Sequence, residues 1–307
     1  MKKSKKKVLI TGVSGLVGRN LTPYLIKKGF RIVGCSKSKF DHSVFGSEDF
    51  LYEKINLCSQ KETAALFRKH NFDLIIHLAG LIKTGFSYYD GITELFSNNV
   101  IATYNLLSNA ININKAAKFI YTSSMTVYGI PEYLPVDEFH PTNPLDFYST
   151  TKLMSEKMIH FLSMNSKLNY FILRLPGIFS STRRSGTLFN FVEDALSNRN
   201  ITIKLNRKIP WDIICIDDVI EVISACIYNK SAENVIINID YGTKIEFRII
   251  AEKIKKLTNS KSNIINDFPF NETPFYFDNK NAKQILNLKL PSLDYRLKEY
   301  VNYFKNV

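Results

Sequence analysis

A tyrosine and a lysine four positions apart, Tyr148 and Lys152, are the pair in this sequence best suited to moving a proton. On a helix this spacing places the two side chains on one face. A nearby ammonium favours the phenolate, so we expect Lys152 to lower the pKa of Tyr148 from about 10 toward neutrality. A phenol with such a pKa can act as a general base or a general acid. The spacing therefore predicts proton transfer to or from a substrate oxygen.

Position along the chain separates this pair from others with the same spacing. Tyr24 and Tyr276 also have a lysine four residues further on, as chance allows in a chain with 16 tyrosines. Only Tyr148 follows an apolar segment that ends in hydroxyl side chains, at 122–124. A strand ending in hydroxyls can position a substrate, so this pair alone is predicted to be catalytic.

Three glycines spaced three apart, Gly12, Gly15 and Gly18, follow the apolar run 8–10 and precede an apolar pattern typical of a helix. A strand, a glycine turn and a helix N-terminus together form an anion-binding site, because free N–H groups and the helix dipole face the turn. Glycine also lets a pyrophosphate approach the backbone closely. We interpret the turn as a dinucleotide site; the alternative is a tight structural turn.

The end of the second expected strand, 31–35, bears on the choice of cofactor. NAD enzymes usually carry an Asp or Glu there, which accepts a hydrogen bond from the ribose 2′-hydroxyl. This chain has Ser36 and Lys37, with Lys39 close behind and no carboxylate before Asp41. Hydroxyl and ammonium groups suit a 2′-phosphate, so we expect NADP(H) to be favoured over NAD(H). The alternative is that the lysines face solvent and the backbone holds the ribose.

Charge and composition argue against several classes of protein. The 307 residues carry a formal net charge of +13, but five of the positive charges lie in the first seven residues. The others are scattered, which argues against nucleic-acid binding. No apolar run approaches the ~18 residues that a membrane span needs, and the four cysteines show neither C-x-x-C nor metal-ligand spacing. We expect a cytoplasmic protein with reduced thiols, no metal, and no nucleic-acid or membrane partner.

Strand and helix patterns alternate along much of the chain, as in a doubly wound parallel sheet. Strands are expected at 8–10, 31–35, 73–80, 118–124, 170–175 and 235–239, and a further strand is expected to end over 53–57. Helices are expected behind the glycine turn and at 60–70, 94–110 and 147–162, with another beginning near 217. From about 180 the alternation loosens, which indicates a smaller region interleaved with the sheet.

In their order and spacing these motifs resemble the extended short-chain dehydrogenase/reductase family, in its nucleotide-sugar epimerase/dehydratase group. The resemblance is carried by the glycine triplet and by the segments 73–80, 99–103, 122–129, 148–152, 173–179, 216–219 and 278–286. It implies an α/β fold with a Rossmann-type doubly wound parallel sheet at 1–178, regained at about 213–240. A smaller interleaved C-terminal substrate-binding cap would comprise 179–212 and 241–307. We also expect a homodimer.

The resemblance assigns roles to individual residues. Tyr148 would exchange a proton with a substrate hydroxyl while a hydride passes between the same carbon and the nicotinamide. Ser124 would hold the reacting oxygen, and Lys152 would also bind the nicotinamide ribose. Cofactor contacts are expected from Gly12, Ser14, Gly15, Leu16, Val17, Gly18, Ser36, Lys37, Asn56, Leu57, Leu78, Ala79, Gly80, Asn99, Thr122, Ser123, Tyr148, Lys152, Leu175, Pro176, Gly177 and Ile178. Substrate contacts are expected from Ser124, Met125, Thr126, Tyr148, Arg183, Arg184, Arg207 and Trp211.

Departures from the family pattern narrow the reaction. The 4,6-dehydratases carry Asp and Glu after the catalytic hydroxyl, whereas this chain has Met125 and Thr126, so dehydration is not expected. The cysteine that the 3,5-epimerase/reductase branch places near Thr126 is also missing. The arginine that commonly precedes Asp212 and binds the nucleotide diphosphate is replaced by Trp211. This tryptophan would either stack on a base or sugar or lie buried in the cap core.

We therefore expect an NAD(P)-dependent nucleotide-sugar 4-epimerase or 4-ketoreductase of carbohydrate biosynthesis. Two alternatives stay open: a reductase of a non-nucleotide carbonyl compound, and a non-catalytic protein that senses NADP. The intact Ser124, Tyr148 and Lys152 argue against the non-catalytic alternative.

Overall fold

Two compact units make up the chain. The computed structural model describes residues 5–82, 91–114, 118–203, 211–244, 246–267 and 275–306. The first unit comprises Met1–Val127, Pro144–Arg174 and Ile220–Ile237, and the second comprises Tyr128–Asn143, Leu175–Val219 and Asn238–Val307. The predicted roles of a cofactor domain and a substrate cap remain predictions.

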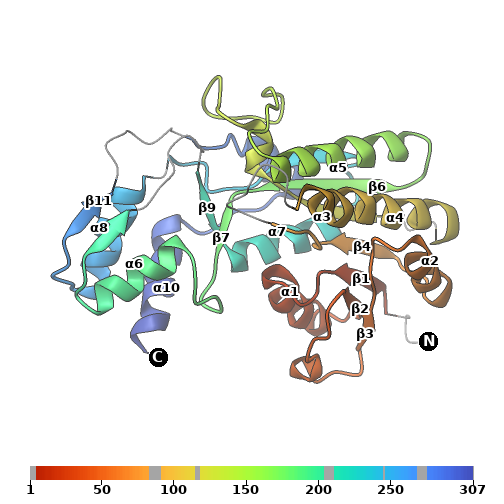
Figure 1. Cartoon of the computed structure of the whole chain (residues 1–307), viewed down its shortest axis with the longest axis horizontal. Coiled ribbons are helices and arrows are strands. Elements are labelled where there is room, and N and C mark those ends of the chain that lie inside the picture. Colours follow the sequence, from red (N-terminus) through yellow and green to blue (C-terminus); the bar gives the residue numbers. More distant parts are fainter. Residues whose placement is uncertain are drawn as a thin grey trace. The chain divides into compact units, whose positions relative to one another are not determined.

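A seven-stranded sheet runs through the first unit in the order β10-β6-β5-β4-β1-β2-β3 (Figure 1). Its strands are β1 (Lys7–Thr11), β2 (Arg31–Ser36), β3 (Phe50–Lys54), β4 (Leu74–His77), β5 (Lys118–Ser124), β6 (Asn169–Leu175) and β10 (Val235–Asn238). β1 pairs in parallel with β2 and β4, β2 with β3, and β4 with β5. The order reverses between β1 and β4, and ligands bind at the carboxyl ends of such strands.

Apolar sequence explains why β1 and β4 take central places in this sheet. Residues 8–10 and Ile75 are completely buried, as is typical of parallel strands covered on both faces. Phe119 of β5 joins the same core as Leu106 and Ile159, which lie on helices. The central strands are therefore fixed by burial, which fixes where their carboxyl ends lie.

Helices follow the strands, as the alternating pattern predicts. They are α1 (Leu16–Lys27), α2 (Gln60–Lys69), α3 (Ile92–Phe96), α4 (Ala102–Asn109), α5 (Phe147–Met164) and α7 (Ile216–Tyr228), which continues from the second unit into the first. The π-helical turns η2 (Ser97–Ile101) and η3 (Ala110–Asn114) flank α4, and short 3₁₀ turns are η1 (Ser43–Phe45) and η4 (Met125–Tyr128). The Asp146 side chain accepts a 2.7 Å hydrogen bond from the Ser149 N–H, which fixes where α5 begins.

The second unit is built from pairs of short strands and from helices that pack together. β7 (Gly177–Phe179) pairs in parallel with β9 (Ile213–Cys215), and β8 (Ile201–Ile203) with β11 (Ile264–Asn266). Its helices are α6 (Thr187–Leu196), α8 (Phe247–Thr258), α9 (Lys280–Leu286) and α10 (Leu293–Lys305). The rings of Phe191 and Phe247 join α6 to α8 with centroids 6.2 Å apart. Aromatic packing thus supplies part of the core that short strands cannot.

The predicted doubly wound sheet is confirmed, with local corrections. The third strand, which was expected to end over 53–57, is Phe50–Lys54, so Ile55 and Leu57 lie beyond it. The single helix predicted at 94–110 is interrupted by η2. No helix within the described ranges is both long and apolar enough to cross a membrane.

Candidate active site

The glycine turn between β1 and α1 leaves no room for side chains. Gly12 has a φ of +68°, and a Cβ there would lie 2.8 Å from the Ala79 nitrogen. A Cβ on Gly18 would lie 2.5 Å from the Gly12 oxygen. The helix therefore packs directly on the strand, and its first N–H groups, at Leu16 and Val17, lack acceptors within the helix. These features fit the pyrophosphate of a dinucleotide.

A buried asparagine on η2 holds the segment that follows β4. The Asn99 Oδ1 accepts a 2.7 Å hydrogen bond from the Leu81 N–H, and its Nδ2 donates to the Leu81 oxygen at 3.1 Å. A Cβ on Gly80 would lie 3.3 Å from both Asn99 Oδ1 and Lys152 Nζ. The predicted cofactor segment Leu78–Gly80 is thus held close to Lys152, on a π turn of the kind often found at functional sites.

The predicted catalytic residues meet where β5 ends and α5 begins. Ser124 is the last residue of β5, and its hydroxyl is hydrogen-bonded to the phenol of Tyr148, in the first turn of α5. Lys152 lies one turn further along α5 and is only 5% exposed, and its Nζ donates to the Thr122 oxygen at 2.8 Å. Thr126 Oγ1 lies 2.9 Å from Ser124 Oγ. The structure therefore brings Ser124, Tyr148 and Lys152 together.

The pKa of Tyr148 does not follow the prediction. Burial raises this pKa to about 12, although the hydrogen bond with Ser124 opposes the shift, and the Asp146 carboxylate raises it further. Lys152 is not among the groups that shift it. The expected fall toward neutrality is wrong for this structure, because burial penalises the phenolate more than the neighbouring groups favour it.

Burial also governs the charge of Lys152. It lowers the pKa of this ammonium to about 8, and the nearby Glu156 carboxylate opposes the shift. The ammonium also lies 4.7 Å from the centroid of the Tyr121 ring, a cation–π contact that favours the charged form. Lys152 is thus a buried cation whose charge depends on a small number of neighbours.

At the carboxyl end of β2, the chain itself uses the hydroxyl that was predicted to meet the ribose. Ser36 Oγ donates to the Ser38 oxygen at 3.0 Å and lies 2.8 Å from the Tyr52 hydroxyl. Lys37 is exposed, and its charge acts on the thiol of Cys58. Of the two predicted residues, Lys37 is therefore the better placed to meet an anionic ligand.

Arg19 is a candidate that sequence reasoning missed. Its Nε donates to the Ser14 oxygen within the glycine turn at 2.8 Å. Its guanidinium carbon lies 4.8 Å from the centroid of the Phe40 ring, beyond the end of β2. Arg19 thus adds a cation between the glycine turn and the segment that carries Lys37. Its position directly after Gly18 was the available signal.

The predicted adenine residues, Asn56 and Leu57, lie between β3 and α2. Asn56 Oδ1 accepts a 3.2 Å hydrogen bond from the Cys58 N–H, and the Leu57 oxygen accepts one from Asn105 Nδ2 at 2.8 Å. These bonds fix the backbone of the loop. The adenine role of the two residues remains a prediction.

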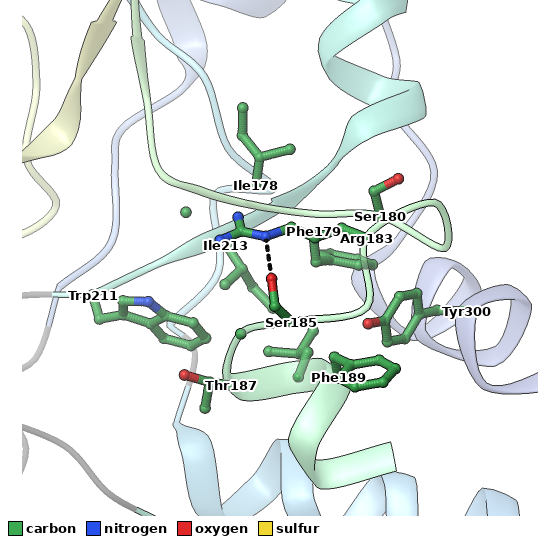
Figure 2. Close-up of a pocket in the computed structure, with 13 residues that line it drawn as sticks. Ile178, Phe179, Ser180, Arg183, Ser185, Thr187, Phe189, Trp211, Ile213 and Tyr300 are labelled. Atoms are coloured by element: carbon green, nitrogen blue, oxygen red, sulfur yellow. Dashed lines mark hydrogen bonds between the residues drawn. The ribbon is translucent and has the colours of Figure 1, made fainter. Parts of the chain in front are cut away.

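Residues predicted for the substrate or for the cofactor line a pocket of about 160 Å³ in the second unit. Figure 2 shows Arg183 near its centre, where Nε donates to Ser185 Oγ at 3.1 Å. Gly177, Ile178 and Trp211 also line it. The remaining lining residues are Phe179, Ser180, Gly186, Thr187, Leu188, Phe189, Ile213 and Tyr300.

Of the other two predicted arginines, the structure describes only Arg184. The Arg184 guanidinium lies 5.9 Å from the centroid of the Phe304 ring, and Arg184 is not among the lining residues. Arg207 lies outside the described residues. Arg183 is therefore the predicted arginine that this pocket presents.

Trp211 forms one wall of the pocket and packs on a core residue of the second unit, and its stacking on a base or sugar stays a prediction. Its indole stacks on Phe247 with centroids 3.5 Å apart and an interplanar angle of 25°. A Cβ on Gly177 would lie 3.4 Å from Trp211 Nε1, so glycine there leaves room for the indole. The tryptophan is half-buried against an aromatic residue and also faces the pocket.

Two buried carboxyl groups directly behind this wall were not foreseen. Asp212 Oδ2 and Asp240 Oδ1 are buried without a partner apart from each other. Burial and then the charge of Asp240 raise the pKa of Asp212 well above its usual range. Burial raises the pKa of Asp240 to about 6, against hydrogen bonds from Asp212 and from the Gly242 and Phe277 N–H groups. The pair therefore shares a proton near neutral pH.

The fold and these two sites define a class of protein. A Rossmann-order sheet with a glycine turn at its switch point is a dinucleotide-binding fold. The Ser–Tyr–Lys set lies where β5 ends and α5 begins. The sequence predicted this set for an extended short-chain dehydrogenase/reductase. In the described ranges, no three side chains of the metal-binding types gather into a cluster.

The family follows from comparison with known proteins. Residues 8–240 match the model of the NAD dependent epimerase/dehydratase family. The chain belongs to this family and is an enzyme of the extended short-chain dehydrogenase/reductase type. It is 26% identical to a protein of Methanocaldococcus jannaschii named putative UDP-glucose 4-epimerase, over 97% of this chain and 98% of the other.

Solved structures share the fold over nearly the whole chain. UDP-glucose 4-epimerase of Thermotoga maritima, crystallised with UDP-glucose, has a TM-score of 0.85 and 21% identity, covering 98% of this chain and 99% of that one. UDP-glucuronic acid 4-epimerase of Bacillus cereus, in complex with UDP-glucuronic acid and NAD, has a TM-score of 0.82 and 22% identity over the same shares.

Proposed function

We propose that this protein is a nucleotide-sugar 4-epimerase or 4-ketoreductase that uses a nicotinamide dinucleotide. The observation that carries the proposal is the hydrogen-bonded pair Ser124 and Tyr148 with Lys152 one turn away, and no carboxyl group in the two positions after Ser124. Met125 is buried, and Thr126 is bound to the hydroxyls of Ser124 and Ser149. Neither can protonate a leaving hydroxyl as a carboxylic acid does, so the site supports hydride and proton transfer at one carbon.

The chain's own residues account for the proton transfer. The neutral phenol of Tyr148 gives its proton to the substrate oxygen when a ketone is reduced and takes a proton back in the reverse step, while Ser124 hydrogen-bonds the reacting oxygen. The buried ammonium of Lys152 lies close to Gly80, where the predicted cofactor segment ends. A bound nicotinamide dinucleotide supplies the acceptor and donor of the hydride, and its pyrophosphate suits the glycine turn.

A nucleotide-activated sugar is the proposed substrate, and the second-unit pocket is its proposed recognition site. Arg183 offers a cation for the diphosphate, because a guanidinium binds phosphate oxygens through paired N–H donors. The exposed face of Trp211 offers a stacking surface for the base or the sugar. The named relatives support this choice, since UDP-sugars are bound in their structures.

For the cofactor we propose a preference for NADP(H). No carboxylate follows β2 before Asp41, and Lys37 and Arg19 bring two cations to that end of the sheet. A 2′-phosphate gains from both cations, whereas a 2′-hydroxyl lacks the carboxylate that usually accepts its proton. The structure of the Bacillus cereus relative holds NAD, so this chain would differ from that relative in its cofactor.

We propose a homodimer formed through α4 and α5. Tyr104, Met154, Phe161 and Met164 expose apolar side chains on these two packed helices, and Phe161 is 65% exposed. A second copy of the chain would cover this surface. Light scattering after gel filtration should give a dimer that Phe161→Glu dissociates and that Phe139→Glu, on an even more exposed residue outside α4 and α5, leaves intact. A monomeric wild type would contradict the proposal. The predicted cytoplasmic location remains a prediction.

The reaction is tested by mass spectrometry and NMR of products from UDP-glucose, UDP-galactose and UDP-glucuronic acid, each with NAD(H) and NADP(H). An epimerase gives a product of unchanged mass, and a ketoreductase changes the mass by two hydrogens as the nicotinamide absorbance changes. Loss of one water would overturn the proposal. Turnover of simple carbonyl compounds alone would favour the non-nucleotide reductase, and cofactor binding without any turnover would favour the sensor.

A further inference from the structure

A buried ion pair lies beneath the proposed reaction centre, in the first unit. Glu156 on α5 is 2% exposed, and Arg174 on β6 is 4% exposed. The Arg174 Nη2 lies 2.7 Å from Glu156 Oε2, and its Nε lies 3.2 Å from Oε1. Ser123 donates its hydroxyl proton to Glu156 Oε1. Two buried polar side chains, those of Arg174 and Ser123, therefore converge on the Glu156 carboxylate.

This cluster is joined to Lys152 and to Ser124 by short connections. Glu156 follows Lys152 by four residues on α5, which places both on one face of the helix. Ser123 directly precedes Ser124, and the carbonyl before it, of Thr122, accepts the proton of Lys152 Nζ. The carboxylate thus holds the end of β5 against α5, at the point where the two elements meet.

Stability alone does not account for a charge buried at this place. Removing two charges from water costs several kcal/mol per ion, and an apolar pair of similar volume is often as stable. The structure surrounds Lys152 with groups that carry no negative charge: His77 on β4, whose pKa burial lowers to about 3, and the phenols of Tyr121 and Tyr148. Glu156 is the anion that acts on the buried Lys152 ammonium.

We propose that Glu156, held by Arg174 and Ser123, is a positioning residue that keeps Lys152 protonated during turnover. The inference rests on the proposed function, because it assumes that the ammonium is needed for the reaction. Arg174 orients the carboxylate, and the phenols of Tyr121 and Tyr170 are other titratable groups on which the same charge acts. The carboxylate itself touches neither the proposed substrate oxygen nor the glycine turn.

The test replaces the charge while keeping the shape. In Glu156→Gln, the loss of the anion and the unpaired Arg174 both lower the pKa of Lys152, by about 1 unit or more. The basic limb of the pH profile of kcat/KM should move to lower pH by the same amount, with about a tenfold loss of activity on the alkaline side. Glu156→Asp keeps the negative charge, so the basic limb of its pH profile should lie at the wild-type pH. Glu193→Gln, which breaks an exposed Glu–Arg pair, should leave the profile unchanged.

A second readout separates this inference from the proposed function. The ¹⁵Nζ signal of Lys152, assigned with Lys152→Arg, reports its pKa by NMR titration whether or not a substrate is known. A fall in this pKa in Glu156→Gln supports the inference even if no nucleotide sugar is turned over. An unchanged pKa with a lower melting temperature would make the pair purely structural and overturn it. If Glu156→Gln does not fold, Arg174→Gln keeps the carboxylate and removes the cation beside it, so the pKa of Lys152 should rise. An unchanged Lys152 pKa in Arg174→Gln would also overturn the inference.

Discussion

The reaction centre of the first unit and the pocket of the second are built in different ways. Around the glycine turn and the Ser–Tyr–Lys set, backbone atoms make the close approaches: a Cβ on Gly18 would lie 2.5 Å from a carbonyl oxygen, and Lys152 donates to a backbone oxygen. In the pocket, side chains form the walls, with Trp211 stacked on Phe247 and Arg183 held by a single serine hydroxyl.

This difference in construction indicates which of the two sites can change its ligand through a single substitution. A site fixed by backbone geometry tolerates few substitutions, because each would move a strand or a helix. A pocket walled by side chains changes its shape with one residue, as Trp211 shows by standing where the family commonly has arginine. We infer that the chemistry is kept by the first unit and that recognition is set by the second.

The largest expected effect comes from the phenol. Tyr148→Phe should lower kcat by about 10²–10⁴-fold, because proton transfer by a positioned group contributes that much. Cofactor affinity, measured by fluorescence titration, should stay within a few fold of the wild type. Lys152→Ala should weaken both turnover and cofactor binding. Near-normal activity of Tyr148→Phe on the identified substrate would break the assignment of the reaction centre.

The pocket should respond through substrate affinity rather than rate. Arg183→Ala should raise KM for a nucleotide sugar by about 10–100-fold, the value of a hydrogen bond to a charged group, with kcat nearly unchanged. Arg184→Ala is the matched control, since Arg184 does not line the pocket. Equal effects of both variants in steady-state kinetics would mean that the pocket is not the recognition site.

A smaller effect is expected at the end of β2. Lys37→Ala should weaken NADPH binding by about twofold to fivefold and leave NADH binding unchanged, because one exposed ion pair is lost. Lys61→Ala, an exposed lysine on α2, should leave both affinities unchanged. Isothermal titration with both cofactors measures the ratio. A wild-type preference for NADH would exclude the proposed cofactor.

The smallest effect concerns stability. Asp212 and Asp240 have raised pKa values in the folded protein, so the folded state binds a proton more tightly than the unfolded chain. The fold should therefore lose stability as the pH rises from near 3.8 through about 6, and further as Asp212 titrates. Asp240→Asn, which cannot ionise, should raise the melting temperature at pH 8 by about 2–4 °C. At pH 4 the difference should vanish, and Asp267→Asn, on an exposed residue, should change neither value.

Local sequence predicted the reaction centre well because its parts lie on regular elements. The strand at 118–124 and the helix from Phe147 have the predicted starts, and their apolar patterns are long enough to define them. The glycine turn was predicted for the same reason, because it lies between a strand and a helix that both have clear apolar patterns. What local sequence cannot express is tertiary burial: the pKa of Tyr148 depends on how much of the chain covers it, and the shared proton of Asp212 and Asp240 joins residues 28 positions apart.

Ser36 and Glu156 show the same limit on a finer scale. Ser36 was expected to meet the ribose, but Tyr52, on the neighbouring strand, takes its hydroxyl. Glu156 looked like an ordinary helix residue, because nothing near it in the sequence announces Arg174 on β6. Residue type predicts which groups can react, whereas the register between strands decides which of them are left available.

The π turn at Ser97–Ile101 has a consequence for how this gene can change in length. A π turn is an α-helix with one extra residue in a turn, and each residue of an α-helix advances the chain by about 100°. Deleting one residue here would close the turn into regular α geometry, because the extra residue is taken up within the turn and the helix on either side keeps its phase. Leu106 and Leu107, both completely buried, would then stay in the core, whereas the wide turn that presents Asn99 to Leu81 would be lost. We expect a single-residue deletion in this turn to leave the fold intact and to loosen the segment that follows β4.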